Sequence, residues 1–483
     1  MDRLAGAPHA PRGVGVSAPR HVAVVGGGIA GLACALRLAE AGVGVAVIET
    51  RRKLGGRATS FVDPRTGEVL DNCQHVLMGC CTNLLDFYDR LGVADAIEWH
   101  PVVRWANPPR APDVMQPGPL PAPAHFTGSF LRMRMLSLGA KIAVARAMWR
   151  LLRLGATGRA RWEGRTFLEF LLETRQPEEA VRLFWSPVVV SACNLDVDRV
   201  GASPAMQVFQ EGFLANRVAP VMGLSTLPLV RLYDPAEPAI IAAGGRLSLG
   251  VSARAIAFDG RRVTGVVTDE GMVDADAVVS AVPADRLAKL CSGSLRSADG
   301  RLRHLESIGH GTILGVHLRF PVRVMEVPHL VLPGRGTQWL FDKGVGEDGS
   351  QHLHAVISDA DAWMELDEPS IAARVVDDVR WALPAARGVE PTSVRSVKER
   401  RATFAAVPGL EARRPTAAPT GLDRDGGVRN LFLAGDWTRT GWPATMEGAV
   451  RSGYLAAGAI LGRRLVVPDL PPAPLARLLG VAR

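Results

Sequence analysis

Three glycines near the N-terminus are spaced as in turns that bind a nucleotide pyrophosphate. Gly26, Gly28 and Gly31 directly follow a short apolar run, residues 21–25 (HVAVV), and open a stretch with helical spacing. The first glycine permits a tight turn, the second lets the backbone approach phosphates, and the third allows a helix to pack closely on a strand. The helix N-terminus, where Ala30 lies, offers unpaired N–H groups to the phosphates. The pattern predicts a dinucleotide site, and a glycine-rich turn without a ligand is the alternative.

An acidic residue and a second glycine pair follow the next apolar run. Residues 43–49 (VGVAVIE) end in Glu49, where a carboxylate binds ribose hydroxyls and disfavours the 2′-phosphate of NADP. Gly55 and Gly56 precede Arg57, so the backbone can come close to a ligand whose phosphates meet a cation. By itself this second motif could equally be a loop with a surface arginine. Its place just after the ribose-binding acid favours the ligand.

A third motif lies near the C-terminus. Residues 430–434 (NLFLA) form an apolar run, Gly435 and Asp436 follow it, and a helix is expected from about Thr445 to Gly462. The glycine turn, the ribose-binding acid, the L-G-G-R segment and this Gly-Asp pair together resemble the FAD-dependent amine oxidase and phytoene desaturase superfamily. For the last motif alone, a surface strand–turn–helix is the alternative.

The resemblance implies a role in FAD binding for residues of each motif. The second glycine pair and Arg57 would contact the pyrophosphate, and Asp436 would bind ribitol or phosphate hydroxyls. The N-terminus of the last helix would face the flavin, where it can stabilise negative charge on the reduced ring. The FAD-binding residues predicted in this way are Gly26, Gly28, Ala30, Gly31, Glu49, Gly55, Gly56, Arg57, Ala253, Gly435, Asp436, Thr445 and Met446.

Further segments narrow the resemblance to one branch of the superfamily. Hydroxysqualene dehydroxylases, the squalene-associated FAD enzymes of bacterial hopanoid pathways, are similar at residues 71–79 (DNCQHVLMG), 185–194, 338–342, 399–404 and 435–453. The resemblance runs from about residue 20 to 462. Cys73 stands where that family has glycine, and Cys193 stands near a usual leucine. If the family's glycine has a positive φ, Cys73 would be strained by about 1–2 kcal/mol.

The narrower resemblance implies a reaction. Hydroxysqualene would lose its allylic hydroxyl and become squalene, with hydride supplied from N5 of reduced FAD and an acid protonating the leaving oxygen. His75 is the candidate proton donor, and Gln74 could hydrogen-bond the flavin or the substrate oxygen. The alternative for His75 is a hydrogen bond to backbone or flavin. We expect Asp71 to fix the loop and Glu447 to cap its helix, and we predict no metal site.

These residues require a particular arrangement of elements. Residues 21–49 read as one strand–helix–strand unit, and Asp259-Gly260 and Glu270-Gly271 interrupt short β-type runs as hairpin turns do. The sequence predicts an α/β fold, with a Rossmann-like FAD-binding domain of the two-dinucleotide-binding-domain flavoprotein type interleaved with an α+β substrate domain. The expected segments are a disordered tail at 1–19, the FAD-binding domain at 20–72, 228–292 and 421–465, the substrate domain at 73–227 and 293–420, and a C-terminal tail at 466–483, with residues 468–474 ending the ordered part.

The composition limits the classes of function. The chain has 483 residues, 47% of them hydrophobic and 22% charged, which suits a globular protein with more than one domain. Its net charge is +8, but we find no zinc spacing, aromatic RNA-binding signature or basic recognition helix, so no nucleic-acid partner is expected. Six scattered cysteines indicate free thiols in a reducing compartment. We therefore expect a cytoplasmic protein, with membrane association on the cytoplasmic face left open.

Residues 131–165 differ in character from the rest of the chain. They combine basic and apolar residues at helical spacing against one acid, Glu163. Such a helix suits docking on anionic lipid, which fits a C30 isoprenoid alcohol that resides in the bilayer. A solvated arginine face on a core-packing helix is the alternative. Because no second glycine phosphate loop is present, we expect a separate electron donor in place of an NAD(P)H domain.

Three rival functions remain open. A phytoene or carotenoid-type desaturase runs the opposite redox direction on the same fold and would share an apolar tunnel. An amine oxidase usually holds its amine between two aromatic rings, which three tyrosines and Trp437 support poorly. The third rival is a non-enzymatic flavin- or lipid-binding protein, and flavin reoxidation by a polyprenyl alcohol would separate it from the enzymes.

Overall fold

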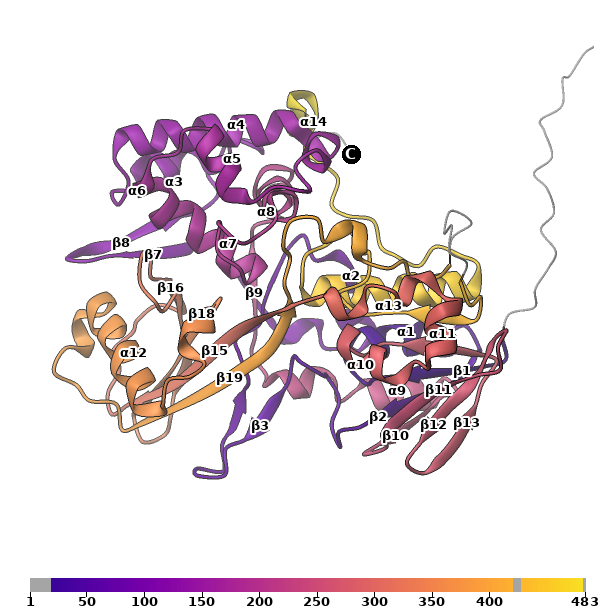
Figure 1. The fold of residues 1–483 in the computed structure, drawn as a ribbon. Helices are drawn as coiled ribbons and strands as arrows, with labels where there is room; N and C mark the ends of the chain where they lie inside the picture. The colour runs from indigo at the N-terminus through magenta and orange to yellow at the C-terminus, as the bar shows by residue number, and fades with distance from the viewer. Residues whose placement is uncertain (1–18, 420–426, 481–483) are drawn as a thin grey trace, which may run out of the picture.

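A five-stranded parallel sheet forms one half of the molecule (Figure 1). The computed structural model describes residues 19–419 and 427–480, so the tail predicted at 1–19 lies outside the described residues except for Pro19. The strands β1, β14 and β20 are buried on both faces, as expected for apolar runs in a parallel sheet, whereas the edge strand β10 is partly exposed. In spatial order they are β10 (Arg246–Leu249), β2 (Gly44–Glu49), β1 (His21–Val25), β14 (Ala277–Ser280) and β20 (Leu431–Leu433).

Two helices from opposite ends of the chain pack together on this sheet. They are α1 (Ile29–Ala39) and α13 (Met446–Leu461), and a Cβ on Gly453 of α13 would lie 2.3 Å from the carbonyl oxygen of Ala30. This close approach requires glycine. The same half contains the antiparallel sheet β11 (Ala253–Phe258), β12 (Val263–Thr268) and β13 (Gly271–Asp274), and helices α2 (Thr82–Arg90), α9 (Ala236–Ala242), α10 (Ala284–Leu290) and α11 (Gly293–Ala298).

A second, mixed sheet forms the other half together with a helical layer (Figure 1). Helix α12 (Glu368–Ala382) packs on this sheet through Ile371, Val375 and Val379. In spatial order its strands are β19 (Ser393–Phe404), β15 (His310–Phe320), β18 (Gln351–Ser358), β17 (Trp339–Val345), β16 (His329–Val331), β7 (Val103–Asn107) and β8 (Arg110–Met115). Short strands link the halves: β3 (Ser60–Val62), β4 (Val69–Asp71), β5 (Val76–Met78), β6 (Ile97–His100) and β9 (Met222–Ser225).

The helical layer surrounds an aromatic core in which Trp185, Phe167 and Phe209 are buried and in ring contact. The basic stretch 131–165 is mostly helical, as predicted, and α4 bends where Gly155 has a φ of 57°. The helices of this layer are α3 (Thr127–Arg132), α4 (Leu138–Ala160), α5 (Phe167–Glu173), α6 (Glu178–Ala180), α7 (Ser186–Cys193) and α8 (Ala202–Phe209).

Two expectations need correction. Order does not end at residue 474, because α14 (Pro474–Leu479) follows the proline-rich run and packs beside α4 with Ala476 fully buried. Cys73 carries no backbone strain, since the non-glycine residues with positive φ in the described chain are Arg175, Asn194 and Asp359. No helix in residues 19–419 or 427–480 combines the length and apolarity needed to span a bilayer.

Candidate active site

One cavity of about 1370 Å³ joins the two halves of the molecule. Every residue predicted to bind FAD lines it except Gly31, and Gln74 and His75 line it as well. These residues come from segments that are far apart in sequence. The cavity volume exceeds the roughly 300–1,000 Å³ that is usual for one small ligand, so it has room for a cofactor and a substrate together.

The glycines form a cradle that side chains would fill. Gly26 has a φ of +111°, and Gly28 begins α1 without a side-chain cap, so the first N–H groups of α1 point toward the cavity. Gly31 acts by packing, because a Cβ there would lie 1.9 Å from the carbonyl oxygen of Gly26. Gly56 faces the first turn, since its Cβ would lie 3.0 Å from the Gly28 Cα. An uncapped helix end between two backbone turns fits a pyrophosphate.

Glu49 is oriented by the backbone on either side of it. Its Oε2 accepts a hydrogen bond from the Gly27 N–H at 2.6 Å, and its Oε1 accepts one from the Arg51 N–H at 2.8 Å. Each carboxylate oxygen can accept a further bond, which leaves capacity for ribose hydroxyls. Ala253 borders the same cavity at the start of β11.

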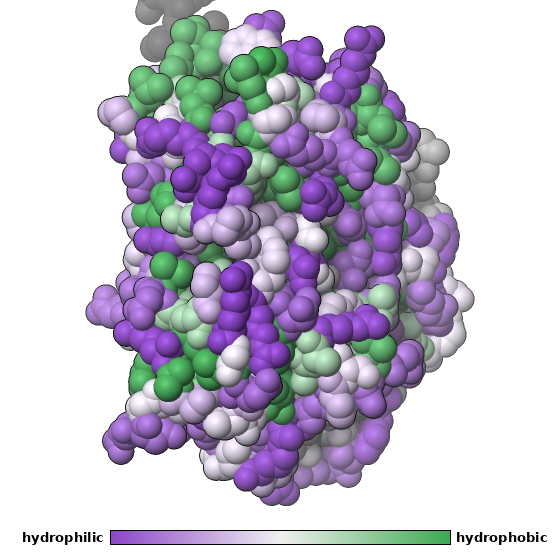
Figure 2. All heavy atoms as spheres, turned by 90° about the vertical axis from the view of Figure 1, so that its left-hand side faces the viewer, coloured by the Kyte–Doolittle hydropathy of each residue, from purple (hydrophilic) through white to green (hydrophobic). Residues whose placement is uncertain are grey.

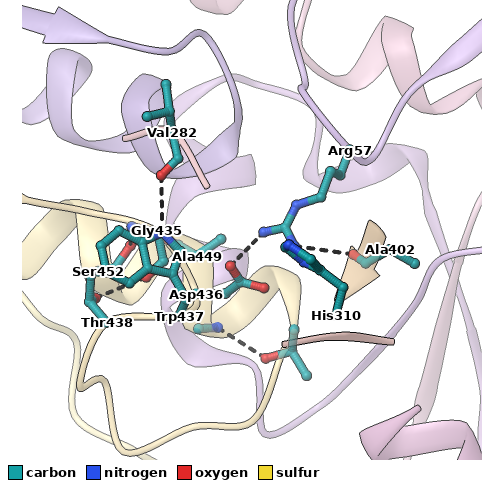
Figure 3. Close-up of polar contacts among 12 residues, drawn as sticks. Arg57, Val282, His310, Ala402, Gly435, Asp436, Trp437, Thr438, Ala449 and Ser452 are labelled. Carbon is teal, nitrogen blue, oxygen red and sulfur yellow. Dashed lines mark hydrogen bonds and ion pairs between the residues drawn. The ribbon is translucent and has the colours of Figure 1, made fainter. Parts of the chain in front are cut away.

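The second and third motifs meet in an ion pair (Figure 3). The Arg57 Nη2 lies 2.5 Å from the Asp436 Oδ1, and the Arg57 Nη1 donates to the Ala402 carbonyl at 3.2 Å. Asp436 is almost fully buried, whereas about a third of the Arg57 side chain is exposed. The turn is held in place because the Gly435 N–H donates to the Ser452 Oγ and the Trp437 Nε1 donates to the Val282 carbonyl. A cation and a carboxylate are thus fixed at the cradle, where a nucleotide's phosphates and hydroxyls would need them.

The start of α13 completes this end of the cavity. Thr445 caps the helix by accepting a hydrogen bond from the Gly448 N–H at 3.1 Å, and Met446 follows on the cavity wall. Glu447 does not cap its own helix, contrary to expectation. Its fully buried carboxylate accepts bonds from the Leu84 N–H and the Asn83 amide, both at 2.8 Å, and so caps α2 instead.

Gln74 and His75 lie in the segment between β4 and β5, on the cavity wall. The His75 Nδ1 lies 3.1 Å from the Cys73 carbonyl, a contact in which the ring nitrogen must be the donor. In the neutral ring the Nε2 then carries no proton. Burial lowers the pKa of His75 below its ordinary value, so the neutral form dominates near pH 7. His75 can donate a proton at Nε2 only after the ring has been protonated.

Lys343 is a site residue that sequence reasoning missed. Its Nζ donates to the Gln74 Oε1 at 3.0 Å and lies 3.5 Å from the Asp71 Oδ2. This contact fixes which way the Gln74 amide points, with its oxygen on Lys343. Its NH₂ group donates one hydrogen bond to the His75 carbonyl at 3.4 Å and keeps a second N–H as a donor. The signal was present in the alternation of β17, because Trp339, Phe341 and Lys343 share one face of the strand.

The Asp71 carboxylate is also held from two other sides. Its Oδ1 accepts hydrogen bonds from the Ser60 Oγ at 2.7 Å and the Leu229 N–H at 2.9 Å. These bonds tie the strand that leads into the Gln74–His75 segment to the paired strand β3 and to Leu229, which is remote in sequence.

A parallel sheet with this glycine cradle defines a dinucleotide-binding protein of Rossmann-like fold. More particularly, the chain belongs to the family described as flavin containing amine oxidoreductase, whose profile matches residues 29–461. The protein is therefore an FAD-dependent oxidoreductase, and the residues of the cradle fit that cofactor.

Relatives of similar length come from two groups of enzymes. The chain is 29% identical over 458 residues to a hydroxysqualene dehydroxylase of Rhodopseudomonas palustris, covering 91% of this chain and 98% of that protein. It is 25% identical over 465 residues to a 15-cis-phytoene desaturase of Synechococcus elongatus, covering 92% and 96%. Among solved structures, an oxidoreductase from Methanosarcina mazei is similar with a TM-score of 0.70 at 18% identity, covering 92% of this chain and 100% of that one. That likeness concerns the fold alone.

Proposed function

We propose that this enzyme removes the allylic hydroxyl of hydroxysqualene reductively and so forms squalene. The observation that carries the proposal is one continuous cavity, which has an FAD cradle at one end, an apolar chamber at the other and Gln74 and His75 on its wall. The 29% identity to a hydroxysqualene dehydroxylase supports the same reaction. In each turnover the allylic carbon of the alcohol accepts a hydride, and the hydroxyl group takes up a proton and departs as water. Reduced FAD, when bound, would supply that hydride and be oxidised.

The chamber suits a long hydrocarbon. Aromatic and aliphatic side chains line it, among them Trp105, Phe126, Phe130, Phe184, Phe213 and Trp339. Recognition of a polyprenyl chain depends on buried apolar area and not on directional bonds. A chamber of this kind also excludes water from the reacting carbon, which protects an allylic cation from solvent.

The polar residues at the junction have distinct tasks in this proposal. The Gln74 NH₂ group, oriented by Lys343, donates a hydrogen bond to the substrate oxygen. His75, once protonated, transfers its Nε2 proton to the departing hydroxyl and returns to the neutral ring that donates to Cys73. Electrons come from a separate donor.

A carotenoid-type desaturation is the second candidate, because a phytoene desaturase is 25% identical over 92% of this chain. That reaction uses oxidised FAD and removes hydrogen from the hydrocarbon, so the two candidates run in opposite redox directions. They demand the same apolar chamber, and product analysis separates them.

The deciding experiment follows the flavin and the products together. Photoreduced holoenzyme is mixed anaerobically with hydroxysqualene, and oxidised holoenzyme is mixed with phytoene or a primary amine, followed by mass analysis. We expect flavin reoxidation by hydroxysqualene with equimolar squalene, and no product from the other two. Dehydrogenated phytoene without any squalene would refute the proposal and support a desaturase. No product in any mixture would favour a flavin- or lipid-binding protein without enzymatic activity.

A further inference from the structure

The apolar end of the cavity opens at the surface between α3, α4 and α14. Leu131, Leu138, Ile142 and Trp149 line the cavity and are also 59%, 71%, 52% and 51% exposed. Side chains that border both a cavity and solvent mark its mouth. The mouth therefore runs along the outer edge of α4, which lies at the top of the molecule in Figure 1.

Helix α4 carries two apolar faces. The inward face is part of the core through Ala140, Val144 and Leu151. The outward face places Leu138, Ile142, Ala145 and Trp149 at spacings of four, three and four residues, which aligns them in one stripe. A surface helix normally turns its polar face to water, so a second apolar stripe on the solvent side indicates a docking surface.

The C-terminal helix α14 extends this surface. Leu475 and Leu479 line the mouth of the cavity, while Leu478 points outward with 83% of its surface exposed. The segment is anchored, because the Ala473 N–H donates to the Ala215 carbonyl at 2.8 Å and the Asn216 amide donates to the Pro471 carbonyl at 2.9 Å. Helix α14 is therefore a fixed wall of the mouth.

Helices α3, α4 and α14 carry basic residues and no acidic ones. Helix α4 contains no acidic residue, and its Arg146 and Arg153 are exposed without an ion-pair partner among the residues described. Arg150, in contrast, is neutralised by Glu173. Arg132 on α3 and Arg477 on α14 are exposed as well. A second copy of this chain would present the same positive charge, so repulsion opposes self-association through this face.

We propose that α3, α4 and α14 together seat the enzyme on an anionic bilayer, with the cavity mouth opening into the hydrocarbon. Figure 2 shows apolar side chains among hydrophilic ones along the upper edge of the molecule, where these helices lie. Unpaired arginines meet lipid phosphates while the apolar stripe enters the acyl boundary. The use of this surface for substrate entry rests on the proposed lipid substrate, whereas the docking itself does not.

The test is flotation of holoenzyme with phosphatidylcholine vesicles that contain or lack phosphatidylglycerol. We expect binding to the anionic vesicles only, weakened by salt. Arg146→Gln with Arg153→Gln should reduce binding by about fivefold per charge, and Leu478→Ser should reduce it severalfold. The matched controls Arg246→Gln with Arg429→Gln and Ile241→Ser change exposed residues elsewhere and should float like the parent.

Turnover of detergent-dispersed hydroxysqualene separates this inference from the proposed function. None of Arg146, Arg153 and Leu478 lines the cavity, so these variants should keep the parent's rate in detergent. Vesicle binding without any turnover would refute the proposed function and leave the docking standing. Docking is overturned by absence of vesicle binding, by variants that float like their controls, or by lipid-free self-association that the same variants abolish.

Discussion

The two ends of the cavity are built on different principles. At the cradle, glycines and directional bonds set each position, as in the 2.5 Å contact between Arg57 and Asp436 and the 2.6 Å bond from the Gly27 N–H to Glu49. At the other end, apolar side chains from α3, α4 and α14 surround an opening to the surface. A polar ligand needs fixed partners, whereas a hydrocarbon needs only area and shape. Substitutions at the cradle should therefore have larger effects than those in the chamber.

Gly31→Val should have the largest effect. Its Cβ would meet the Gly26 carbonyl oxygen at 1.9 Å, so the glycine turn must shift. We expect FAD affinity to fall by at least about 100-fold, at the upper end of overpacking costs. The flavin bound per chain is measured after its release by heat. The control Gly139→Ala has open space around its Cβ and should keep its flavin, and full occupancy in Gly31→Val would contradict the cradle.

Arg57→Ala should have the second largest effect on FAD affinity. It leaves the buried Asp436 carboxylate without its ion-pair partner, at a cost of about 1.5–3 kcal/mol. We expect a 10- to 100-fold weaker FAD affinity by fluorescence titration, with partial recovery in Arg57→Lys. Arg401→Ala, which breaks an exposed pair with Asp285, serves as the control. Equal losses of FAD affinity in both variants would show that the Arg57–Asp436 pair has no specific role in binding FAD.

His75→Ala tests the junction between the two ends. Since His75 lies on the cavity wall and not in the glycine cradle, FAD occupancy should remain unchanged. The rate at which hydroxysqualene reoxidises photoreduced flavin should fall at least about tenfold, within the usual range for general acid catalysis. Stopped-flow absorbance gives both quantities. An unchanged rate would remove His75 from the mechanism.

The same rate should depend on pH in a defined direction. Burial lowers the pKa of His75 below its ordinary value of 6.5, so the protonated donor becomes populated only as pH falls beneath that value. The reoxidation rate should rise as the pH is lowered, with an inflection below 6.5, and His75→Gln should be flat over the same range. A rate that rises with pH instead would indicate a base and overturn the assignment.

Phe130→Leu should give the smallest effect. Phe130 contributes apolar area to the chamber, and the smaller side chain should cost about 1 kcal/mol of substrate binding. We expect the KM for hydroxysqualene to rise about fivefold, with unchanged kcat and flavin content. A collapse in kcat would show that the chamber positions the substrate as precisely as the cradle positions the cofactor.

The features of the site that the sequence predicts differ in kind from those that it does not predict. The predicted FAD cofactor and fold class are confirmed. They could be predicted because the glycine spacing and the acid at the end of the second strand reflect what the backbone needs within a few residues. Lys343 was missed, because the alternation of β17 shows only which face the lysine shares and not that Gln74, a residue far away in sequence, lies against it. Glu447 was assigned to its own helix for the same reason, because its partners Asn83 and Leu84 are remote in sequence. The catalytic roles of His75 and Gln74 stay predictions.

By itself the sequence determined the nucleotide fold, the FAD cofactor and the amphipathic character of residues 131–165. Period, turn chemistry and residue type depend on near neighbours, so they can be read along the chain. The tertiary structure alone decided that Arg57 pairs with Asp436, that Glu447 caps α2, and that α14 borders the mouth of the cavity. These contacts depend on which distant segments the packing of two halves brings together, and no local pattern encodes that choice.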